Sequence, residues 1–469
     1  MNPDEFRKAG HRVIDWIADY RATVESRPVM ATTQPGAIKA MLPAAPPQQA
    51  EPVDAILNDL DTVVVPGITA WQHPRFFGYF PSNGLFASLL GDYVSSGLGV
   101  VGLAWQSSPA LTEVEEVVVD WTRQMLGLSD AWSGVINDTA STSTLVALLC
   151  ARERTTQYSL ARGGLQAEPQ PLVIYTSPYS HSSVEKAAVL AGFGKAHVRA
   201  VPCDASYAMR PDALAHMMAD DSASGARPCA VVATCGTTTT TAFDPLEAIA
   251  TVAQANGAWL HVDAAMAGSA MILPECRSLW HGVERADSLI VNAHKWLGAV
   301  FDCTLYFVRD PEHLVRVMST NPSYLQSAAD GRVKNYRDWG LPLGRRFRAL
   351  KLWFLIREQG VAGLQARLRR DLANAAWLTE RVSQAEHWKV LAPVKLQTVC
   401  VRHEPPGVEG EALDRHTLDW AARLNQSGEA YVTPAMLDGR WMVRVSIGAE
   451  LTERDHVAQL WQLMQEQVQ

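Results

Sequence analysis

The chain between residues 111 and 355 alternates short apolar runs with longer amphipathic stretches. Leu172–Thr176, Trp259–Asp263 and Ser288–Asn292 are mostly apolar runs of strand length, which is typical of strands buried on both faces. Other expected strands are Val135–Asn137, Val198–Pro202, Ala230–Thr234 and Thr304–Val308. The stretches between them carry apolar residues at helical spacing. This alternation predicts an α/β domain with a mostly parallel central sheet.

The segments that flank this region have different patterns. Near the N-terminus we expect an amphipathic helix at about 4–21, a Pro- and Ala-rich linker at 42–52 and a short helix at 53–63. Beyond a long helix at about 350–365, strands at 398–402 and 441–446 alternate with helices at 413–425 and 452–466. The pattern predicts an N-terminal helical arm at 1–84, a large α/β domain at 85–358 and a small α+β domain at 359–469. The arm has little core of its own, which suggests that it packs against a second subunit.

The composition of the chain limits the class of protein to which it can belong, but it does not indicate a particular reaction. Its 469 residues are enough for two or three domains, and 48% of them are hydrophobic. The net charge of −8 gives no reason to expect a nucleic-acid partner. No apolar run reaches the ~18 residues of a membrane span, and the first residues lack a secretion-signal pattern. The seven cysteines have no CxxC spacing, so we expect a cytoplasmic enzyme with reduced thiols, no metal and no membrane partner.

Two charged residues follow buried strands of the predicted sheet. Lys295 comes just after the run Ser288–Val291, and Asp263 ends the run Trp259–Asp263. Ligands of open parallel sheets bind outside the carboxyl ends of the strands, where both side chains are expected. Pyridoxal phosphate needs this pair, because a lysine amine bonds to its aldehyde and a carboxylate keeps its pyridine nitrogen protonated. Either residue alone is more often a surface or turn residue, but the pair is a strong signal for this cofactor.

Three further polar groups fall at strand ends in the same domain. The run Asp138–Thr144 precedes a helical stretch at 145–154, and small hydroxyl residues there can bind a phosphate or merely cap the helix. His181 could stack on a cofactor ring or contact a substrate carboxylate, although a single histidine is usually structural. The five threonines at 237–241 follow Gly236, which permits a sharp turn. A hydroxyl group from this turn could reach the cofactor.

Two aromatic features lie outside the expected strands. The stretch Trp71–Pro81 is dense in aromatic residues, which indicates either core packing or an aromatic substrate pocket. The polar stretch Leu325–Asp338 contains Tyr336 and is expected to be a mobile loop. Such a loop could close over a site, exclude water and deliver a proton. An exposed loop without a function is an equal alternative.

Six longer strings are more specific than these single features. They are Phe77–Pro81 (FGYFP), Ser108–Ala110 (SPA), His181–Lys186 (HSSVEK), His261–Ala265 (HVDAA), Asn292–Trp296 (NAHKW) and Pro342–Arg348 (PLGRRFR). Together they resemble the pyridoxal-phosphate-dependent group II decarboxylases, most closely the aromatic L-amino acid (DOPA-type) decarboxylases. The resemblance covers nearly the whole chain. It implies a type I, aspartate-aminotransferase-like fold and an obligate homodimer with composite active sites.

The resemblance also implies roles for single residues. Lys295 would bond to the cofactor, Asp263 would pair with the pyridine nitrogen and His181 would stack on the ring. Tyr336 would protonate the α-carbon after carbon dioxide leaves. The residues implied to hold the phosphate are Ala140, Ser141 and Asn292, with Thr238 near the cofactor. Those implied for the aromatic pocket are Tyr79, Phe80, Pro81 and His181, together with Val101 and Leu103 from the partner subunit.

The implied reaction converts an aromatic L-amino acid into its amine and carbon dioxide, which is a step of amine biosynthesis. Candidate substrates are L-DOPA, 5-hydroxytryptophan, tryptophan, tyrosine and phenylalanine. Met266 and Leu103 stand where animal members carry an aromatic residue, and Ala293 stands where they carry a proline. These departures affect which substrate is expected to be preferred, and they do not affect the type of reaction that is expected. Gly344 leaves room for an indole as well as a catechol.

Three other functions fit parts of the same pattern. An aldehyde synthase of this family resembles the decarboxylases but commonly replaces the loop tyrosine or the stacking histidine, and the chain keeps both Tyr336 and His181. A type I aminotransferase needs an arginine for the substrate carboxylate, for which Arg444 is a candidate, although the motif strings disfavour it. A cofactor-binding scaffold without turnover is disfavoured because Lys295 and Asp263 are both present.

Overall fold

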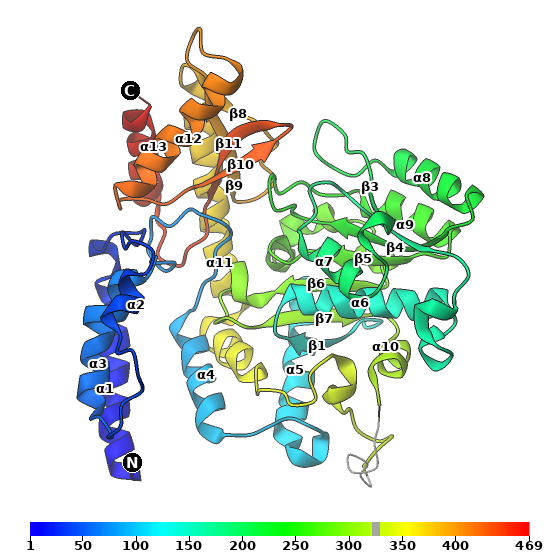
Figure 1. The fold of residues 1–469 in the computed structure, drawn as a ribbon, viewed down its shortest axis with the longest axis horizontal. Coiled ribbons are helices and arrows are strands. Elements are labelled where there is room, and N and C mark those ends of the chain that lie inside the picture. The colour runs from blue at the N-terminus through cyan, green and yellow to red at the C-terminus, as the bar shows by residue number, and fades with distance from the viewer. Residues whose placement is uncertain (321–328, 469) are drawn as a thin grey trace. The chain divides into compact units, whose positions relative to one another are not determined.

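A computed structural model describes residues 1–320 and 329–468 of the chain. The chain forms two compact units (Figure 1). The larger unit comprises residues 82–370 and 392–398, and the smaller comprises residues 1–81, 371–391 and 399–469. The N-terminal segment, which was expected as an arm apart from the C-terminal domain, therefore shares a unit with it. In the described part of the chain, no helix is both long and apolar enough to span a membrane.

The larger unit is built on a seven-stranded sheet of order β1-β7-β6-β5-β4-β2-β3. Its strands are β1 (Ser133–Asn137), β2 (Leu172–Thr176), β3 (Val198–Ala200), β4 (Arg227–Thr234), β5 (Trp259–Asp263), β6 (Ser288–Asn292) and β7 (Thr304–Val308). Strand β7 is antiparallel to both neighbours, and the remaining pairs are parallel. The predicted α/β class with a mostly parallel sheet is confirmed.

The helices of the larger unit alternate with the strands, as the pattern predicts. They are α4 (Phe86–Leu98), α5 (Pro109–Leu126), α6 (Ala140–Thr155), α7 (Ser183–Leu190), α8 (Pro211–Ala223), α9 (Leu246–Ala255), α10 (Pro311–Met318) and the first part of α11 (Ala349–Gln384). Apolar side chains of α6 and α7, such as Val146 and Ala187, pack against sheet residues such as Ile174, Val232 and Ile290. This buried layer fixes the strands whose carboxyl ends carry the polar residues.

Two helices differ from the sequence prediction. Helix α6 begins at Ala140 rather than near residue 145, because the side chain of Thr139 accepts a hydrogen bond from the Thr142 amide and caps the helix. Helix α11 extends to Gln384 rather than to about 365, with a break at Gly360, whose φ is 60°. A glycine tolerates this left-handed conformation, so the chain resumes the helix after the break.

The smaller unit has its own sheet of order β10-β11-β9-β8. Its elements are α1 (Pro3–Ala22), α2 (Ala37–Met41), α3 (Val53–Asp59), β8 (Trp388–Val390), β9 (Thr398–His403), α12 (Gly410–Gln426), β10 (Thr433–Leu437), β11 (Arg440–Ser446) and α13 (Arg454–Gln467). Trp388 packs edge-on against Trp420 and Trp461, with ring centroids 5.7 and 5.1 Å apart. Phe77 donates its amide to the Tyr431 carbonyl over 2.8 Å, which ties the aromatic stretch at 71–81 to this unit.

Candidate active site

The carboxyl edge of the large sheet gathers the polar residues that the sequence places at strand ends. Asp263, the last residue of β5, is in register with Thr234 at the end of β4. Asn292, the last residue of β6, is in register with Thr304 of β7, which in turn is in register with Asn137 of β1. Asp263 and Asn292 are each about 95% buried. The strand order therefore brings residues that are far apart in sequence to one edge.

Lys295 stands in a turn whose backbone is tightly constrained. The helical turn Ala293–Leu297 is interrupted at Lys295, where φ is −97° and ψ is −112°, and it ends at Gly298 with a φ of 105°. His294 lies beside it with Nδ1 2.9 Å from the Cys303 amide, and burial lowers the pKa of His294 to about 4. A neutral His294 adds no positive charge next to the lysine. Lys295 itself is partly buried, and its backbone position is fixed by its neighbours.

His181 interacts electrostatically with both Lys295 and Asp263. Its Nδ1 lies 2.8 Å from the Ser183 hydroxyl and accepts the Ser183 amide over 3.2 Å. Burial lowers the pKa of His181, Asp263 raises it and Lys295 lowers it. His181 thus lies within electrostatic range of both charged residues. The structure therefore brings His181, Asp263 and Lys295 near one another.

The start of helix α6 offers unpaired amides next to these residues. Ala140 and Ser141 occupy its first two positions, where backbone N–H groups have no partner within the helix. The Ser141 side chain is exposed. Such a helix start favours a phosphate group through its amides and its dipole.

Thr304 joins this helix start to the lysine strand. Its hydroxyl lies 2.9 Å from the Asn292 side-chain oxygen and 3.1 Å from the Asp138 carbonyl oxygen. The sequence analysis did not single out Thr304, because a threonine at the beginning of a buried strand looks like an ordinary strand residue. Thr304 can contact both residues only because β7 is inserted antiparallel between β1 and β6.

The threonine run after β4 forms a compact turn. Gly236 has a φ of 89°, and a Cβ on it would lie 2.4 Å from the Ala267 side chain, so both conformation and space require glycine. The hydroxyl of Thr237 lies 3.0 Å from that of Thr240 and accepts the Ala242 amide over 3.0 Å. Thr238 is less buried than Thr237. The turn therefore presents Thr238 while the Thr237 hydroxyl holds the fold of the turn.

Asp244 is a buried carboxylate that the sequence analysis did not predict. It accepts the amides of Thr234 and Met209, each over 2.7 Å, and it is 2% exposed. Burial raises the pKa of Asp244 to about 6. Its two bonds anchor the end of β4 beside Asp263.

Tyr336 occupies a place that differs from the expected exposed loop. Residues 325–328 of the predicted loop lie outside the described residues. Within the part that is described, Tyr336–Trp339 forms a short 3₁₀ helix, and Tyr336 is 3% exposed. Its ring lies 4.9 Å from the guanidinium carbon of Arg345, and its hydroxyl group donates to the Gly134 carbonyl over 3.5 Å. Burial, Glu115 and Glu116 raise the pKa of this phenol well above its usual value.

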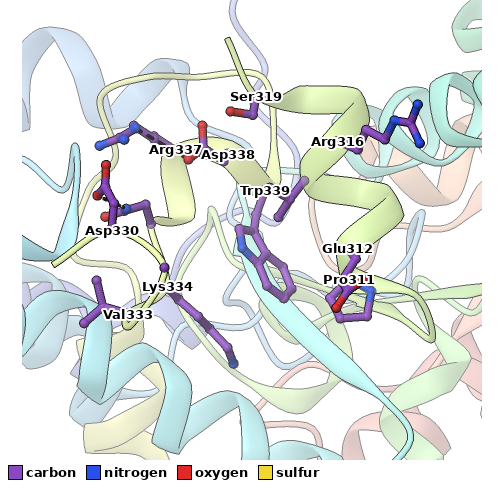
Figure 2. A pocket seen from close by; sticks show the side chains of 13 residues that line it. Pro311, Glu312, Arg316, Ser319, Asp330, Val333, Lys334, Arg337, Asp338 and Trp339 are labelled. Atoms are coloured by element: carbon purple, nitrogen blue, oxygen red, sulfur yellow. Dashed lines mark hydrogen bonds and ion pairs between the residues drawn. The ribbon is translucent and has the colours of Figure 1, made fainter. Parts of the chain in front are cut away.

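The segment that carries Tyr336 also forms one wall of a cavity. The cavity lies between helix α10 and residues 330–339, with Arg316, Lys334 and Trp339 among its lining residues (Figure 2). His181, Asp263 and Lys295 do not line it. It is therefore separate from the site at the carboxyl edge of the sheet.

The residues predicted for the aromatic pocket fall in both units. Val101 and Leu103 belong to the larger unit, where Val101 is 54% exposed and the Gly102 amide donates to the Arg345 carbonyl over 2.8 Å. Tyr79, Phe80 and Pro81 belong to the smaller unit. There, the Tyr79 hydroxyl lies 3.2 Å from that of Tyr431, and Phe80 lies under the Arg444 guanidinium at 4.8 Å.

The described residues contain no group of three histidine, cysteine, aspartate or glutamate side chains that could hold a metal ion. A lysine, a carboxylate, a histidine and a helix start at the carboxyl edge of an α/β sheet instead fit pyridoxal phosphate. These features define the class of a type I pyridoxal-phosphate enzyme.

Comparisons with known proteins agree with this class. The conserved domain of pyridoxal-dependent decarboxylases matches residues 35–404. Tryptophan decarboxylase 2 of Oryza sativa subsp. japonica is 38% identical over all of this chain and 95% of that protein. Phenylacetaldehyde synthase of Arabidopsis thaliana is 39% identical over all of this chain and 96% of that protein. The crystal structure of Oryza sativa TDC with PLP and tryptamine superposes with a TM-score of 0.97 at 38% identity, covering all of this chain and 98% of that one.

The chain belongs to the pyridoxal-dependent decarboxylase family. The predicted resemblance, the carboxy-lyase class and the pyridoxal phosphate cofactor are confirmed by this membership. The type I fold implied by the resemblance is confirmed as well.

Proposed function

We propose that this protein decarboxylates an aromatic L-amino acid to the corresponding amine and carbon dioxide, and so serves amine biosynthesis. The convergence of His181, Asp263 and Lys295 carries the proposal, because it supplies each group that the cofactor needs. The aromatic class is supported by the 38% identity with a tryptophan decarboxylase over the full chain. The motif strings that include the aromatic stretch at 77–81 support it further.

The residues of the site have distinct tasks in this proposal. Bound pyridoxal phosphate supplies a protonated pyridine ring that accepts the electron pair left on the α-carbon when carbon dioxide departs. Lys295 holds the cofactor through its amine, Asp263 keeps the proton on the ring nitrogen, and His181 packs on the ring face. The groups proposed to bind the phosphate are the amides of Ala140 and Ser141 and the side chains of Thr238 and Asn292. Tyr79, Phe80 and Pro81 are proposed to line the aromatic pocket, together with Val101 and Leu103 from the partner subunit.

Tyr336 is proposed to return a proton to the α-carbon. In the structure its contacts are with Gly134, Trp339 and Arg345. A proton transfer to a substrate bound at Lys295 therefore requires Tyr336 to leave its place under Arg345.

An aldehyde synthase of the same family is the second candidate. It is favoured by the 39% identity with a phenylacetaldehyde synthase and by the Tyr336 hydroxyl, which is engaged with the Gly134 carbonyl. If no proton reaches the α-carbon, oxygen can oxidise the carbon instead. One dioxygen and one water are consumed for each amino acid, and the products are the aldehyde, carbon dioxide, ammonia and hydrogen peroxide.

The experiment that separates the two is an aerobic incubation of the cofactor-loaded protein with L-DOPA, 5-hydroxytryptophan, tryptophan, tyrosine and phenylalanine. Mass spectrometry identifies the organic product, and a peroxidase assay measures peroxide. Amine without peroxide is expected. Tyr336→Phe serves as the matched variant and should divert product towards aldehyde and peroxide. Aldehyde from the unaltered protein would instead establish the second candidate.

We further propose that two copies of the chain form a homodimer. Helix α4 exposes Phe86, Leu90, Tyr93, Val94 and Leu98, each at 39–57% of its surface. Phe86, Leu90, Val94 and Leu98 follow one another at intervals of four residues, and Tyr93 lies three residues after Leu90, so they line one face of the helix as an apolar stripe. A stripe of this kind usually marks an interface, and the exposed Val101 continues it. A second copy covering the stripe would also cover Val101, in keeping with a composite site.

The cytoplasm is the proposed location of the protein. None of the seven cysteines forms a disulfide, and five of them are buried. Burial raises the pKa of the Cys150 and Cys229 thiols, so these side chains stay protonated and serve as small apolar core residues. A protein whose seven cysteines form no disulfide suits a reducing compartment. Recovery of the native protein in the cytoplasmic fraction of its source cells would test this location.

A further inference from the structure

Thr234 is a buried polar residue that the proposed function does not use. It ends strand β4 and is 3% exposed. Its hydroxyl oxygen has no hydrogen-bond partner among the described residues. A buried hydroxyl without a partner is costly, so such a group in a native protein calls for an explanation.

The register of the sheet places Thr234 directly beside Asp263. The two residues are paired across the parallel strands β4 and β5, so their side chains point to the same face. The backbones of adjacent strands lie about 5 Å apart, so side chains of paired residues on one face are close enough for a hydrogen bond of about 2.7 Å between their oxygens. On the other side, β2 ends at Thr176, opposite Val232. Asp263 is therefore the acidic residue paired with Thr234 on the neighbouring strands of the sheet.

Hydrogen bonds outside the sheet ladder also fix the backbone of Thr234. The Asp244 carboxylate accepts the Thr234 amide over 2.7 Å, and the Asp244 amide donates to the Thr234 carbonyl over 3.1 Å. The next residue, Cys235, donates its amide to the Asp263 carbonyl over 2.9 Å. These bonds hold the Thr234 backbone at a constant place beside β5.

From this geometry we propose that the Thr234 hydroxyl donates a hydrogen bond to the Asp263 carboxylate when pyridoxal phosphate is bound, and so acts as a positioning residue. The bond orients one carboxylate oxygen, and the other is left to meet the protonated pyridine nitrogen. Thr234 touches neither substrate nor cofactor in this role. The inference rests on the proposed role of Asp263, and it adds a residue to which no role has been assigned.

The test compares Thr234→Val with Thr234→Ser. Valine has the shape of threonine without the hydroxyl, and serine keeps the hydroxyl. Pyridoxal phosphate binding to the apoprotein is followed by the absorbance of the bound cofactor, and thermal unfolding is measured with and without it. Thr234→Val should bind the cofactor about tenfold more weakly, which is the effect of one charge-assisted hydrogen bond. Thr234→Ser should bind it nearly as well as the unaltered protein.

The unfolding data separate a positioning role from a structural one. The Thr234→Val apoprotein should unfold at the same temperature as the unaltered apoprotein or at a higher one, because it loses an unpartnered buried hydroxyl. Only the increment of stability that the cofactor adds should shrink. Thr122→Val is the matched control, since Thr122 is fully buried in the same unit and its hydroxyl donates to the Val118 carbonyl within α5. It should leave cofactor affinity unchanged.

A double-mutant cycle shows whether Thr234 acts through Asp263. In an Asp263→Ala background, Thr234→Val should have no further effect on cofactor affinity. Equal affinity of Thr234→Val and the unaltered protein, or an undiminished effect in the Asp263→Ala background, would overturn the proposal. Neither result would contradict the proposed decarboxylation, because the products of the unaltered protein test that proposal separately.

Discussion

At the scale of single residues, the site depends on a few groups whose chemistry is not interchangeable. Lys295, Asp263 and His181 come from three different segments at the edge of the sheet and meet through the strand order. All three could be predicted from the sequence, because each follows an apolar run and belongs to a long motif. Thr234, Asp244 and Thr304 could not be predicted, because their roles depend on neighbours in space.

Lys295→Ala should give a folded protein without turnover. The substitution removes the amine that bonds to the cofactor, so kcat should fall by at least about 10⁴-fold. The thermal unfolding temperature of the apoprotein should stay close to that of the unaltered protein, since Lys295 is only partly buried. Steady-state amine formation and circular dichroism check the two halves of this prediction. Substantial turnover by this variant would refute the assignment of Lys295.

Asp263→Asn should lower kcat far more than stability. Asparagine can still accept the Ala265 amide, which Asp263 accepts over 3.0 Å, so the local fold is retained. It cannot keep a proton on the pyridine nitrogen, and kcat should fall by about 10²- to 10⁴-fold. Turnover at saturating pyridoxal phosphate and unfolding of the apoprotein measure the two effects. A variant with unchanged kcat would remove Asp263 from the mechanism.

At the scale of structural elements, one buried ion pair links α5, β1 and the segment before α11. Arg345 donates to the Glu115 carboxylate over 2.6 Å and to the Ile136 carbonyl over 2.8 Å, and Glu115 also accepts the Ile136 amide over 2.9 Å. Both side chains are at least 96% buried. The string at 342–348 identified the family, but the pairing with Glu115, which lies some 230 residues earlier, appears only in the fold.

Arg345→Met should destabilise the larger unit strongly. Removing the guanidinium leaves the Glu115 carboxylate buried without its counter-charge, which should lower the free energy of unfolding by about 3–5 kcal/mol. Arg369→Met is the control, because Arg369 pairs with Glu275 over 2.7 Å where both are about half exposed. That change should cost less than about 1 kcal/mol. Urea denaturation followed by tryptophan fluorescence measures both, and equal losses would contradict the prediction.

At the scale of the whole molecule, buried histidines should set the response to acid. Burial lowers the pKa of four of them to about 4, namely His73, His261, His294 and His403. The unfolded chain takes up protons on these residues near pH 6.5, whereas the folded chain does so only near pH 4. The unfolded state therefore binds more protons in this window, and stability should fall as the pH drops from 6.5 to 4. Above pH 6.5 the stability from these groups is fully present.

His403→Gln isolates one contribution to this acid response. His403 Nδ1 lies 2.9 Å from His416 Nε2, and both pKa values are lowered chiefly by burial. The variant should lose less stability than the unaltered protein between pH 7 and pH 5. His216→Gln is the control, because His216 is exposed. Urea midpoints at several pH values provide the measurement, and parallel profiles for all three proteins would argue against the prediction.

Leu90→Glu should convert the proposed homodimer into monomers. The substitution places a charge in the middle of the apolar stripe of α4, where a second copy would bury it. Light scattering after gel filtration should give the mass of two chains for the unaltered protein and of one for the variant. Leu160→Glu changes another exposed leucine, 47% exposed and outside the stripe, and should remain dimeric. If the unaltered protein has the mass of a single chain, the proposal of a homodimer is wrong.

The sequence by itself determined the strands, their alternation with helices and the lysine–aspartate pair. These features are local in the sequence. A strand that is buried on both faces appears as an apolar run of strand length, and a catalytic residue appears as a charged residue at the end of that run. The tertiary structure alone decided which strand ends are neighbours, and it inserted β7 antiparallel between β1 and β6. It also decided the burial of Tyr336 and the placement of Thr234 beside Asp263. Contacts across strands depend on register and chain path, which no short window of sequence contains.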